Sequence, residues 1–143
     1  MLSRTHIVLH HSLTADSKTV SWQAIRRYHM DAMGWSDIGY HYGIELVSDR
    51  HEVLVGRPEH LAAAAVREQD MNRLGLHVCL VGNFDIAPPT EVMLEVAAKS
   101  ILLPLMRRHG IPLVRVVGHH LYAPYKTCPG SLFDWATLLR LLA

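Results

Sequence analysis

Two histidine pairs constrain the fold of this chain most strongly, because each pair stands where a predicted strand meets a loop. His10-His11 ends the apolar run of residues 7–9. His119-His120 opens the loop of residues 118–130, which also carries Lys126 and Cys128. Histidine and cysteine are common zinc ligands. A fold that brings these two distant regions together forms a metal centre with a lysine beside it, an arrangement suited to hydrolysis.

The size and composition of the chain are typical of a single soluble domain. Its 143 residues fit one core, and 50% of them are hydrophobic while 19% are charged. A net charge of +1 argues against a dominant nucleic-acid interaction, which needs a concentrated basic face. No apolar stretch approaches the roughly 20 residues that span a bilayer. We expect one domain over residues 1–143, without membrane insertion and without a signal peptide in the segment 1–6.

Apolar and alternating runs predict five strands, at residues 7–9, 42–47, 52–55, 77–81 and 113–117. Residues 48–51 predict a turn that joins the second and third strands into a hairpin. The run 77–81 is apolar on both faces and therefore predicts a central strand, with Cys79 buried in it. Cys128 lies in a polar loop instead, so we expect the two cysteines to be unpaired and the protein to be made in a reducing compartment.

The first helix is predicted to begin after Ser21 as its cap and to end at Gly34. Its spacing places five side chains on one face, namely those of Trp22, Ile25, Tyr28, His29 and Ala32. The alanine-rich segment 61–67 predicts a further helical turn.

The second half of the chain predicts two more helices. Thr90 is predicted to cap a long helix that Pro104 kinks and Gly110 ends. Ser131 with Asp134 resembles a capping box for a C-terminal helix. Because strands and helices are interspersed and one pairing is a tight hairpin, we expect an α/β fold, a three-layer domain with a central mixed β-sheet flanked by helices.

The metal interpretation needs three protein ligands and an open position for water, as in catalytic zinc sites. Neighbouring residues on a strand point to opposite faces, so each histidine pair supplies one ligand and one bystander. The candidates are one histidine from each pair together with Cys128. The alternative is that these are unrelated loop histidines and a lone thiol, and spacing alone does not decide between the two.

Lys126 and Tyr40 are the candidate catalytic residues beside such a centre. Attack on a carbonyl builds an oxyanion, which the Lys126 cation can stabilise from its position close to Cys128. Tyr40 enters the predicted hairpin and can donate a hydrogen bond to the same oxyanion. The alternatives are a solvated surface lysine and a tyrosine at the rim. His41, its neighbour, is expected to be a structural residue.

Four stretches of the chain resemble one known family. They are IVLHHS at 7–12, GWSDIGYHY at 34–42, VCLVGNFD at 78–85, and the segment from Gly118-His119 to Cys128-Pro129-Gly130. In this order they resemble the zinc-dependent type 2 N-acetylmuramoyl-L-alanine amidases, including phage lysozymes of the T7 type, which share a fold with peptidoglycan recognition proteins. The combination spans nearly the whole chain and is specific.

The resemblance implies a role for five residues. His10, His119 and Cys128 correspond to the ligands of one zinc ion per chain, and Tyr40 and Lys126 to the residues that assist catalysis. The implied reaction is hydrolysis of the amide between the lactyl group of N-acetylmuramic acid and the L-alanine of the stem peptide.

Two departures from the family pattern accompany the resemblance. The chain has one extra residue near Tyr125, between His119 and Cys128. A histidine that the family often carries after the hairpin, and that is not a ligand, is absent from residues 62–66, which read AAAAV. The substrate groove is therefore expected to differ locally. Trp35, at the expected rim of this groove, is a candidate for stacking on sugar, with packing as the alternative.

The leading functional hypothesis is a monomeric peptidoglycan amidase acting as a phage or prophage endolysin. It would be made in the cytoplasm and reach the cell wall after holin-type release, while recycling of wall fragments inside a bacterium is the less favoured variant. A second hypothesis is a non-catalytic peptidoglycan-binding module of the same fold. A third is a regulator that binds phage RNA polymerase, as some members of the T7 type do, although no residue of this chain points to that partner.

Overall fold

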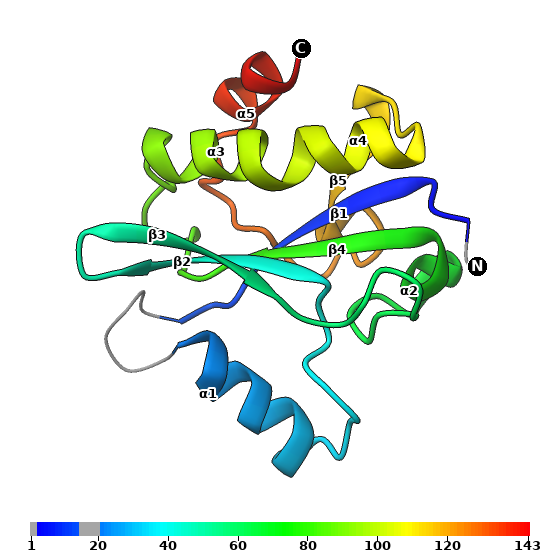
Figure 1. Cartoon of the computed structure of the whole chain (residues 1–143). Helices are drawn as coiled ribbons and strands as arrows, with labels where there is room; N and C mark the ends of the chain where they lie inside the picture. Colours follow the sequence, from blue (N-terminus) through cyan, green and yellow to red (C-terminus); the bar gives the residue numbers. More distant parts are fainter. Residues whose placement is uncertain (1–2, 15–20) are drawn as a thin grey trace.

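The computed structural model describes residues 3–14 and 21–143, which form a five-stranded sheet between helices (Figure 1). The strands are β1 (His6–His11), β2 (Tyr42–Val47), β3 (Arg50–Val55), β4 (Gly75–Leu80) and β5 (Val116–Gly118), in the order β3-β2-β4-β1-β5. Neighbouring strands are parallel except in the β2–β3 hairpin, which is antiparallel. The sheet is therefore mixed and β4 lies at its centre, as the sequence predicted.

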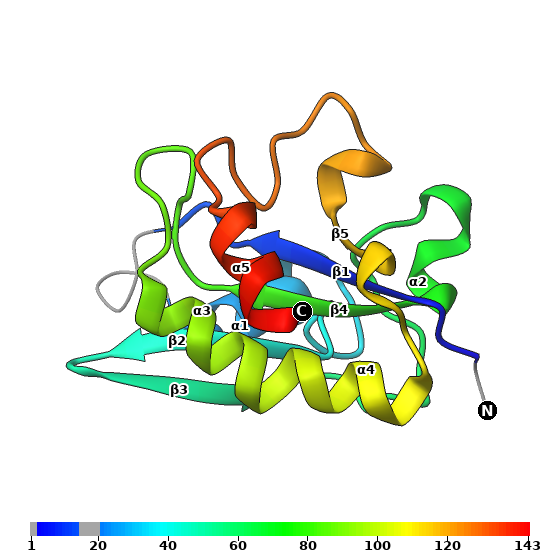
Figure 2. The same ribbon diagram turned by 90° about the horizontal axis from the view of Figure 1, so that it is seen from above.

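Helices cover both faces of this sheet (Figures 1 and 2). One face carries α3 (Glu91–Ala97), the π-helical turn η3 (Ala98–Leu102), α4 (Leu103–His109) and α5 (Trp135–Leu142), and the other carries α1 (Trp22–Arg27). Successive residues of β4 alternate between the two sides, because Val78 joins the core under the long helix while Cys79 packs with Trp22 of α1. The predicted three-layer α/β architecture is confirmed.

Local signals located the first helix correctly but not its buried face. The Ser21 hydroxyl accepts a hydrogen bond from the Ala24 N–H at 3.2 Å, and Gly34 adopts the left-handed conformation with φ of 72°. After α1 the chain widens into the π-helical turn η1 (Tyr28–Ala32), none of whose residues is buried. Tyr28 is consequently exposed rather than part of the core, and only Trp22 and Ile25 of the predicted face are buried.

The long helical segment follows the sequence signals closely. The Thr90 hydroxyl accepts from the Met93 N–H at 3.2 Å, and Gly110 ends the segment with φ of 66°. Pro104 lies in the first turn of α4, directly after the π-helical turn η3. Proline has no N–H to donate to the preceding turn, and a wider turn at this point accommodates its ring.

The alanine-rich segment 61–67 is not helical, contrary to the prediction. It is irregular and leads to the 3-10 turn η2 (Glu68–Asp70) and the short helix α2 (Met71–Leu74). Its backbone is held from outside, since the Asn72 side chain accepts from the N–H groups of Ala65 and Val66 at 2.7 and 2.8 Å. These tertiary hydrogen bonds override the helical propensity of alanine.

Three predicted boundaries also need correction. The hairpin turn is confined to residues 48–49, with Ser48 left-handed, so β3 begins at Arg50. The last strand is shorter than residues 113–117 suggest, because η4 (Leu113–Arg115) is a 3-10 turn that exposes Val114. Asp134 rather than Ser131 caps the final helix, accepting from the Thr137 N–H at 3.1 Å.

Two observations bear on the membrane and export expectations. No helix within the described ranges is long and apolar enough to cross a bilayer. Residues 1–2 of the segment assessed for a signal peptide lie outside the described part of the chain.

Candidate metal centre

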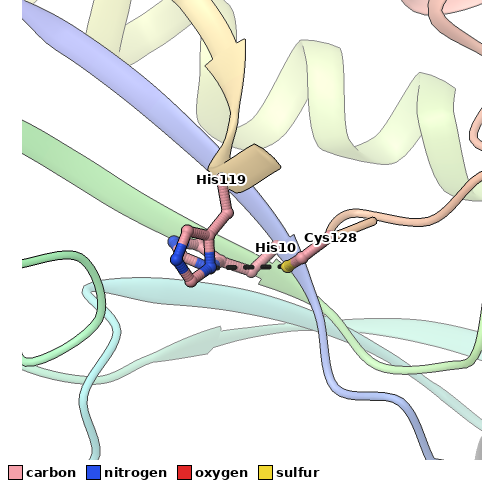
Figure 3. Close-up of side chains that lie close together, drawn as sticks. All are labelled: His10, His119 and Cys128. Carbon is pink, nitrogen blue, oxygen red and sulfur yellow. Dashed lines mark hydrogen bonds between the residues drawn. The ribbon is translucent and has the colours of Figure 1, made fainter. Parts of the chain in front are cut away.

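The carboxyl ends of β1 and β5 bring the two histidine pairs together. The strands pair in parallel, with Leu9 opposite Gly118. His10 is therefore the next residue on β1, and His119 begins the turn η5 (His119–Leu121) directly after β5. Cys128 reaches the same place from the following loop, and the His120 N–H donates to its carbonyl at 2.8 Å. Figure 3 shows the three side chains pointing toward a common point.

The geometry of His10, His119 and Cys128 fits a zinc ion. One ligand atom from each residue lies within 4.8 Å of the other two, and all three residues are buried. His10 Nδ1 and Cys128 Sγ are 3.7 Å apart (Figure 3). Tetrahedral zinc bonds place a sulfur and a nitrogen ligand about 3.6 Å apart. The donor set and its spacing therefore match a three-ligand site with a fourth position open.

Burial sets the protonation of these ligands. It lowers the pKa of His10 well below its ordinary value, with the neighbouring His77 adding to the effect. Burial, followed by the positive charge of Lys126, lowers the pKa of His119 to about 4. Both imidazoles are neutral at pH 7 and offer lone pairs. Burial raises the pKa of the Cys128 thiol to about 11, so this ligand must lose its proton to a metal on binding.

The second histidine of each pair points elsewhere. His11 Nδ1 accepts from the Phe84 N–H at 3.1 Å, and its ring stacks on Phe84 on the long-helix side of the sheet. His120 is exposed, and its Nδ1 lies 3.1 Å from the Cys128 carbonyl oxygen, to which it donates. Each pair thus places one imidazole in the cluster and one outside it.

Tyr40 and Lys126 line the same pocket of about 510 Å³ as the three ligand candidates. The Tyr40 ring centroid is 5.1 Å from that of His10. Burial, assisted by the nearby thiols of Cys79 and Cys128, raises the pKa of Tyr40 well above its ordinary value, so the phenol keeps its proton. Lys126 is exposed on the loop that carries Cys128 and also lines the pocket.

An open groove continues from this pocket along residues 64–72, which include the end of the irregular segment and the turn η2. A second hollow of about 440 Å³ shares part of its lining with the first, namely Trp35, Ala64, Ala65, His119, Tyr125 and Lys126. The segment that was expected to be helical thus forms one wall of the groove. Trp35 is half-buried on the rim, with its ring centroid 4.7 Å from that of His29.

One residue of the site, His77, was not predicted from the sequence. His77 lies on β4 directly behind His10, and His10 Nε2 is 2.9 Å from His77 Nδ1. Burial lowers the pKa of His77 to about 3, so it is neutral. The available signal was a histidine within an otherwise apolar central strand, where an unpartnered polar side chain is costly. Cys79 and Cys128 are both free, in agreement with the prediction that they are unpaired.

Comparisons with known proteins identify the family that the sequence resembles. The family model described as N-acetylmuramoyl-L-alanine amidase matches residues 2–131. The endolysin of Escherichia phage T7 is 31% identical over 127 residues, covering 86% of this chain and 78% of that protein. The human N-acetylmuramoyl-L-alanine amidase is 34% identical over 115 residues, which are 78% of this chain and 19% of that protein.

A solved structure shows the same fold. The Ph2119 endolysin from Thermus scotoductus MAT2119 bacteriophage Ph2119 superposes with a TM-score of 0.79 and 24% identity, covering all of this chain and 87% of the other.

Proposed function

The chain belongs to the N-acetylmuramoyl-L-alanine amidase family, and from this premise we propose that it is a zinc-dependent hydrolase of peptidoglycan. Its reaction would be cleavage of the amide bond between N-acetylmuramic acid and the L-alanine of the stem peptide. One observation carries the proposal: His10, His119 and Cys128 converge as buried ligand candidates in an open pocket that Tyr40 and Lys126 also line. We propose one zinc ion per chain, because residues 3–14 and 21–143 hold one such cluster.

The chemistry divides between the metal and the protein. When bound, zinc would supply a nucleophilic water near neutral pH and polarise the scissile carbonyl. The Tyr40 phenol, which keeps its proton, would donate a hydrogen bond to the carbonyl oxygen as negative charge develops there. The Lys126 cation, which lines the same pocket, would stabilise the same charge. Water adds across the C–N bond, so the lactyl carbon becomes a carboxylate and the alanine nitrogen leaves as a free amine.

The groove suits a substrate that is longer than the scissile bond. Its two connected hollows give room for a sugar on one side of the bond and for the stem peptide on the other. We assign Trp35 to contact with the sugar, because a half-buried indole on the rim presents an apolar face to it.

The biological role we propose is that of a phage or prophage endolysin. The resemblance to the T7 endolysin supports it. The protein would be monomeric, accumulate in the cytoplasm, and act on the cell wall after holin-type release. A binding module of the same fold would need no complete ligand set, so the presence of all three ligands with Tyr40 and Lys126 favours the enzyme.

The decisive experiment is mass analysis of purified peptidoglycan digested with the zinc-loaded protein, with and without a chelator. We expect new free amino groups on L-alanine that disappear on chelation and return when zinc is added back. The matched control is Cys128→Ala, which removes one proposed ligand. Binding to peptidoglycan without any cleavage would identify the binding module instead. Capture of the cognate RNA polymerase by a chain that neither binds nor cuts peptidoglycan would identify the regulator.

A further inference from the structure

The nitrogen of His10 that faces away from Cys128 contacts another buried histidine. His10 Nε2 lies 2.9 Å from His77 Nδ1, and His77 is fully buried on the central strand β4. On its far side, His77 Nε2 lies 2.7 Å from the backbone carbonyl oxygen of Met71. The three groups form a hydrogen-bonded chain that runs from the metal centre to the helix α2.

The carbonyl oxygen at the end of this chain decides where the protons are. A carbonyl oxygen only accepts, so His77 Nε2 must carry the proton that it donates to Met71. A neutral imidazole has one N–H, which leaves His77 Nδ1 as an acceptor. The hydrogen bond between the rings then requires the proton on His10 Nε2. His10 Nδ1 is therefore an unprotonated lone pair, and it is the nitrogen that faces Cys128 Sγ.

The surroundings of His77 fix its ring and backbone. Its backbone N–H donates to His41 Nδ1 at 3.0 Å, and His41 Nε2 donates to the Leu61 carbonyl at 2.9 Å. Gly75 leaves room for the ring, because a Cβ added there would lie 2.8 Å from His77 Nε2 and 2.9 Å from the Met71 oxygen. A glycine at this point thus permits the hydrogen bond between His77 and Met71.

We propose that His77 is a positioning residue of the metal centre, which accepts the Nε2 proton of His10 and thereby presents His10 Nδ1 to the ion. The inference rests on the proposed zinc site and adds to it a residue that is neither a ligand nor in contact with substrate. Metal-binding histidines generally donate their second N–H to an acceptor that sets the tautomer. Here that acceptor is an imidazole, held in turn by a backbone carbonyl.

The first test reads the ring protons directly in the unsubstituted, metal-free protein. Zinc would itself force the proton of His10 onto Nε2, so only the metal-free state reports the effect of His77. Long-range ¹⁵N–¹H correlation spectra at neutral pH distinguish the two tautomers. We expect both His10 and His77 to carry the proton on Nε2. A His10 ring protonated on Nδ1, or one that exchanges between tautomers, overturns the proposal whether or not the protein cleaves peptidoglycan.

The second test measures zinc affinity by competition with a chromophoric chelator. We expect His77→Leu to weaken zinc binding about 10- to 100-fold. His77→Asn, whose amide oxygen can accept in place of Nδ1, should recover most of the loss. His41→Leu is the control for the loss of a buried histidine, since it removes the acceptor of the His77 backbone N–H and leaves both ring hydrogen bonds of His77 in place. Gly75→Ala keeps both imidazoles but crowds His77 Nε2, so it should weaken binding in the same direction as His77→Leu.

The outcomes separate this proposal from the proposed function. Zinc affinity of His77→Leu equal to that of the unsubstituted protein overturns the role of His77 and leaves the amidase untouched. Equal losses in His41→Leu and His77→Leu also overturn it, because the effect is then general destabilisation. If the unsubstituted protein binds no zinc, the proposed function fails, and the ring-proton measurement still decides whether His77 sets the tautomer of His10. That measurement also decides the matter if His77→Leu does not fold.

Discussion

Leu9 of β1 pairs with Gly118 of β5, and this register sets the spacing of the metal centre. The residue after each of them is a histidine, so His10 and His119 lie close together at the carboxyl ends of these two strands. Two hydrogen bonds to the Cys128 carbonyl, from the His120 N–H and from His120 Nδ1, then help to place the thiol beside them. The centre therefore depends on sheet pairing more than on any local motif.

Alanine at His10, His119 or Cys128 is expected to remove most of the bound zinc, because two ligands hold the ion far less tightly than three. Metal content per chain after dialysis, measured by atomic emission, checks this. The controls are His11→Ala and His120→Ala, whose side chains point away from the cluster and should leave most of the metal in place. The opposite pattern would show that the assignment is displaced by one residue in each pair.

Tyr40→Phe and Lys126→Ala are expected to keep zinc and to lower kcat about 10²- to 10³-fold, because each variant loses a group that stabilises the developing negative charge. Release of free L-alanine amino groups from peptidoglycan gives the rate, and metal content is measured on the same samples. Tyr28→Phe and Lys99→Ala are matched controls at exposed positions outside the pocket lining. Normal turnover in either active-site variant would remove that residue from the mechanism.

Zinc binding at pH 6 is expected to release about one proton per ion from the protein ligands. The thiol of Cys128, with a pKa near 11, is protonated in the metal-free state and must lose its proton. The two histidines contribute almost nothing, because the pKa of His119 is about 4 and that of His10 is well below its ordinary value. Calorimetry in buffers of different ionisation enthalpy counts the protons. Release of more than two would show that the histidines are protonated before the metal binds.

Stability of the metal-free protein is expected to fall as the pH drops from 6.5 toward 4. The pKa values of His41 and His119 are about 4 and that of His77 is about 3, all below the ordinary 6.5. The unfolded chain therefore binds more protons than the folded chain in this window. The stability that depends on these neutral histidines is present above pH 6.5 and is lost as the pH falls below it. Thermal melts between pH 7 and 4.5 measure the effect. A melting temperature that stays constant over this range would contradict the expectation.

Between pH 6.5 and 4.5 the loss of stability comes from the histidines and not from Glu59, the carboxylate whose pKa is shifted most. Glu59 is hydrogen-bonded to Tyr42, His109 and Arg108, which lower its pKa to about 2 despite partial burial. Its contribution is lost only below its ordinary pKa of 4.5, as the pH falls toward 2. A further loss of stability below pH 4.5 should therefore shrink in Glu59→Gln, whereas the loss between pH 6.5 and 4.5 should not change.

Arg4→Ala is expected to lower the free energy of unfolding by about 3 kcal/mol, because it leaves several backbone carbonyls without partners. The buried Arg4 guanidinium donates to the carbonyls of Glu59, Leu61, Arg73 and Gly75 at 2.6–3.2 Å. Urea denaturation measures the change, and Arg73→Ala at an exposed position is the control. Equal stability of the two variants would show that the guanidinium is dispensable.

Local signals predicted the fold where the structure is itself local. Ser21 and Thr90 cap their helices through bonds to residues three positions along, and Gly34 and Gly110 end them with left-handed backbone. The strands were predicted from apolar and alternating runs, and the mixed sheet from the hairpin among them. Where contacts come from elsewhere in the chain, the same reasoning failed. The alanine-rich segment 61–67 has high helical propensity, yet Asn72 holds its backbone in an irregular path.

The type of site could be predicted from the sequence, but not which histidine of each pair belongs to it. The residue types and their positions at strand ends indicated a metal centre, whereas the choice within each histidine pair came from family resemblance. Which histidine points inward depends on the pairing of β1 with β5, which no short stretch of sequence encodes. His77 was missed for the same reason, since its partner His10 lies 67 positions away in the chain.

The place of β1 between β4 and β5 has a consequence for biosynthesis. During synthesis β1 must wait for both of its neighbours, and the later of these, β5, is followed by the loop that carries Cys128. A nascent chain therefore has neither a finished sheet nor the complete set of proposed zinc ligands until Cys128 has been translated. The proposed hydrolysis can begin only after that point, so we expect fragments that stop short of Cys128 to be inert.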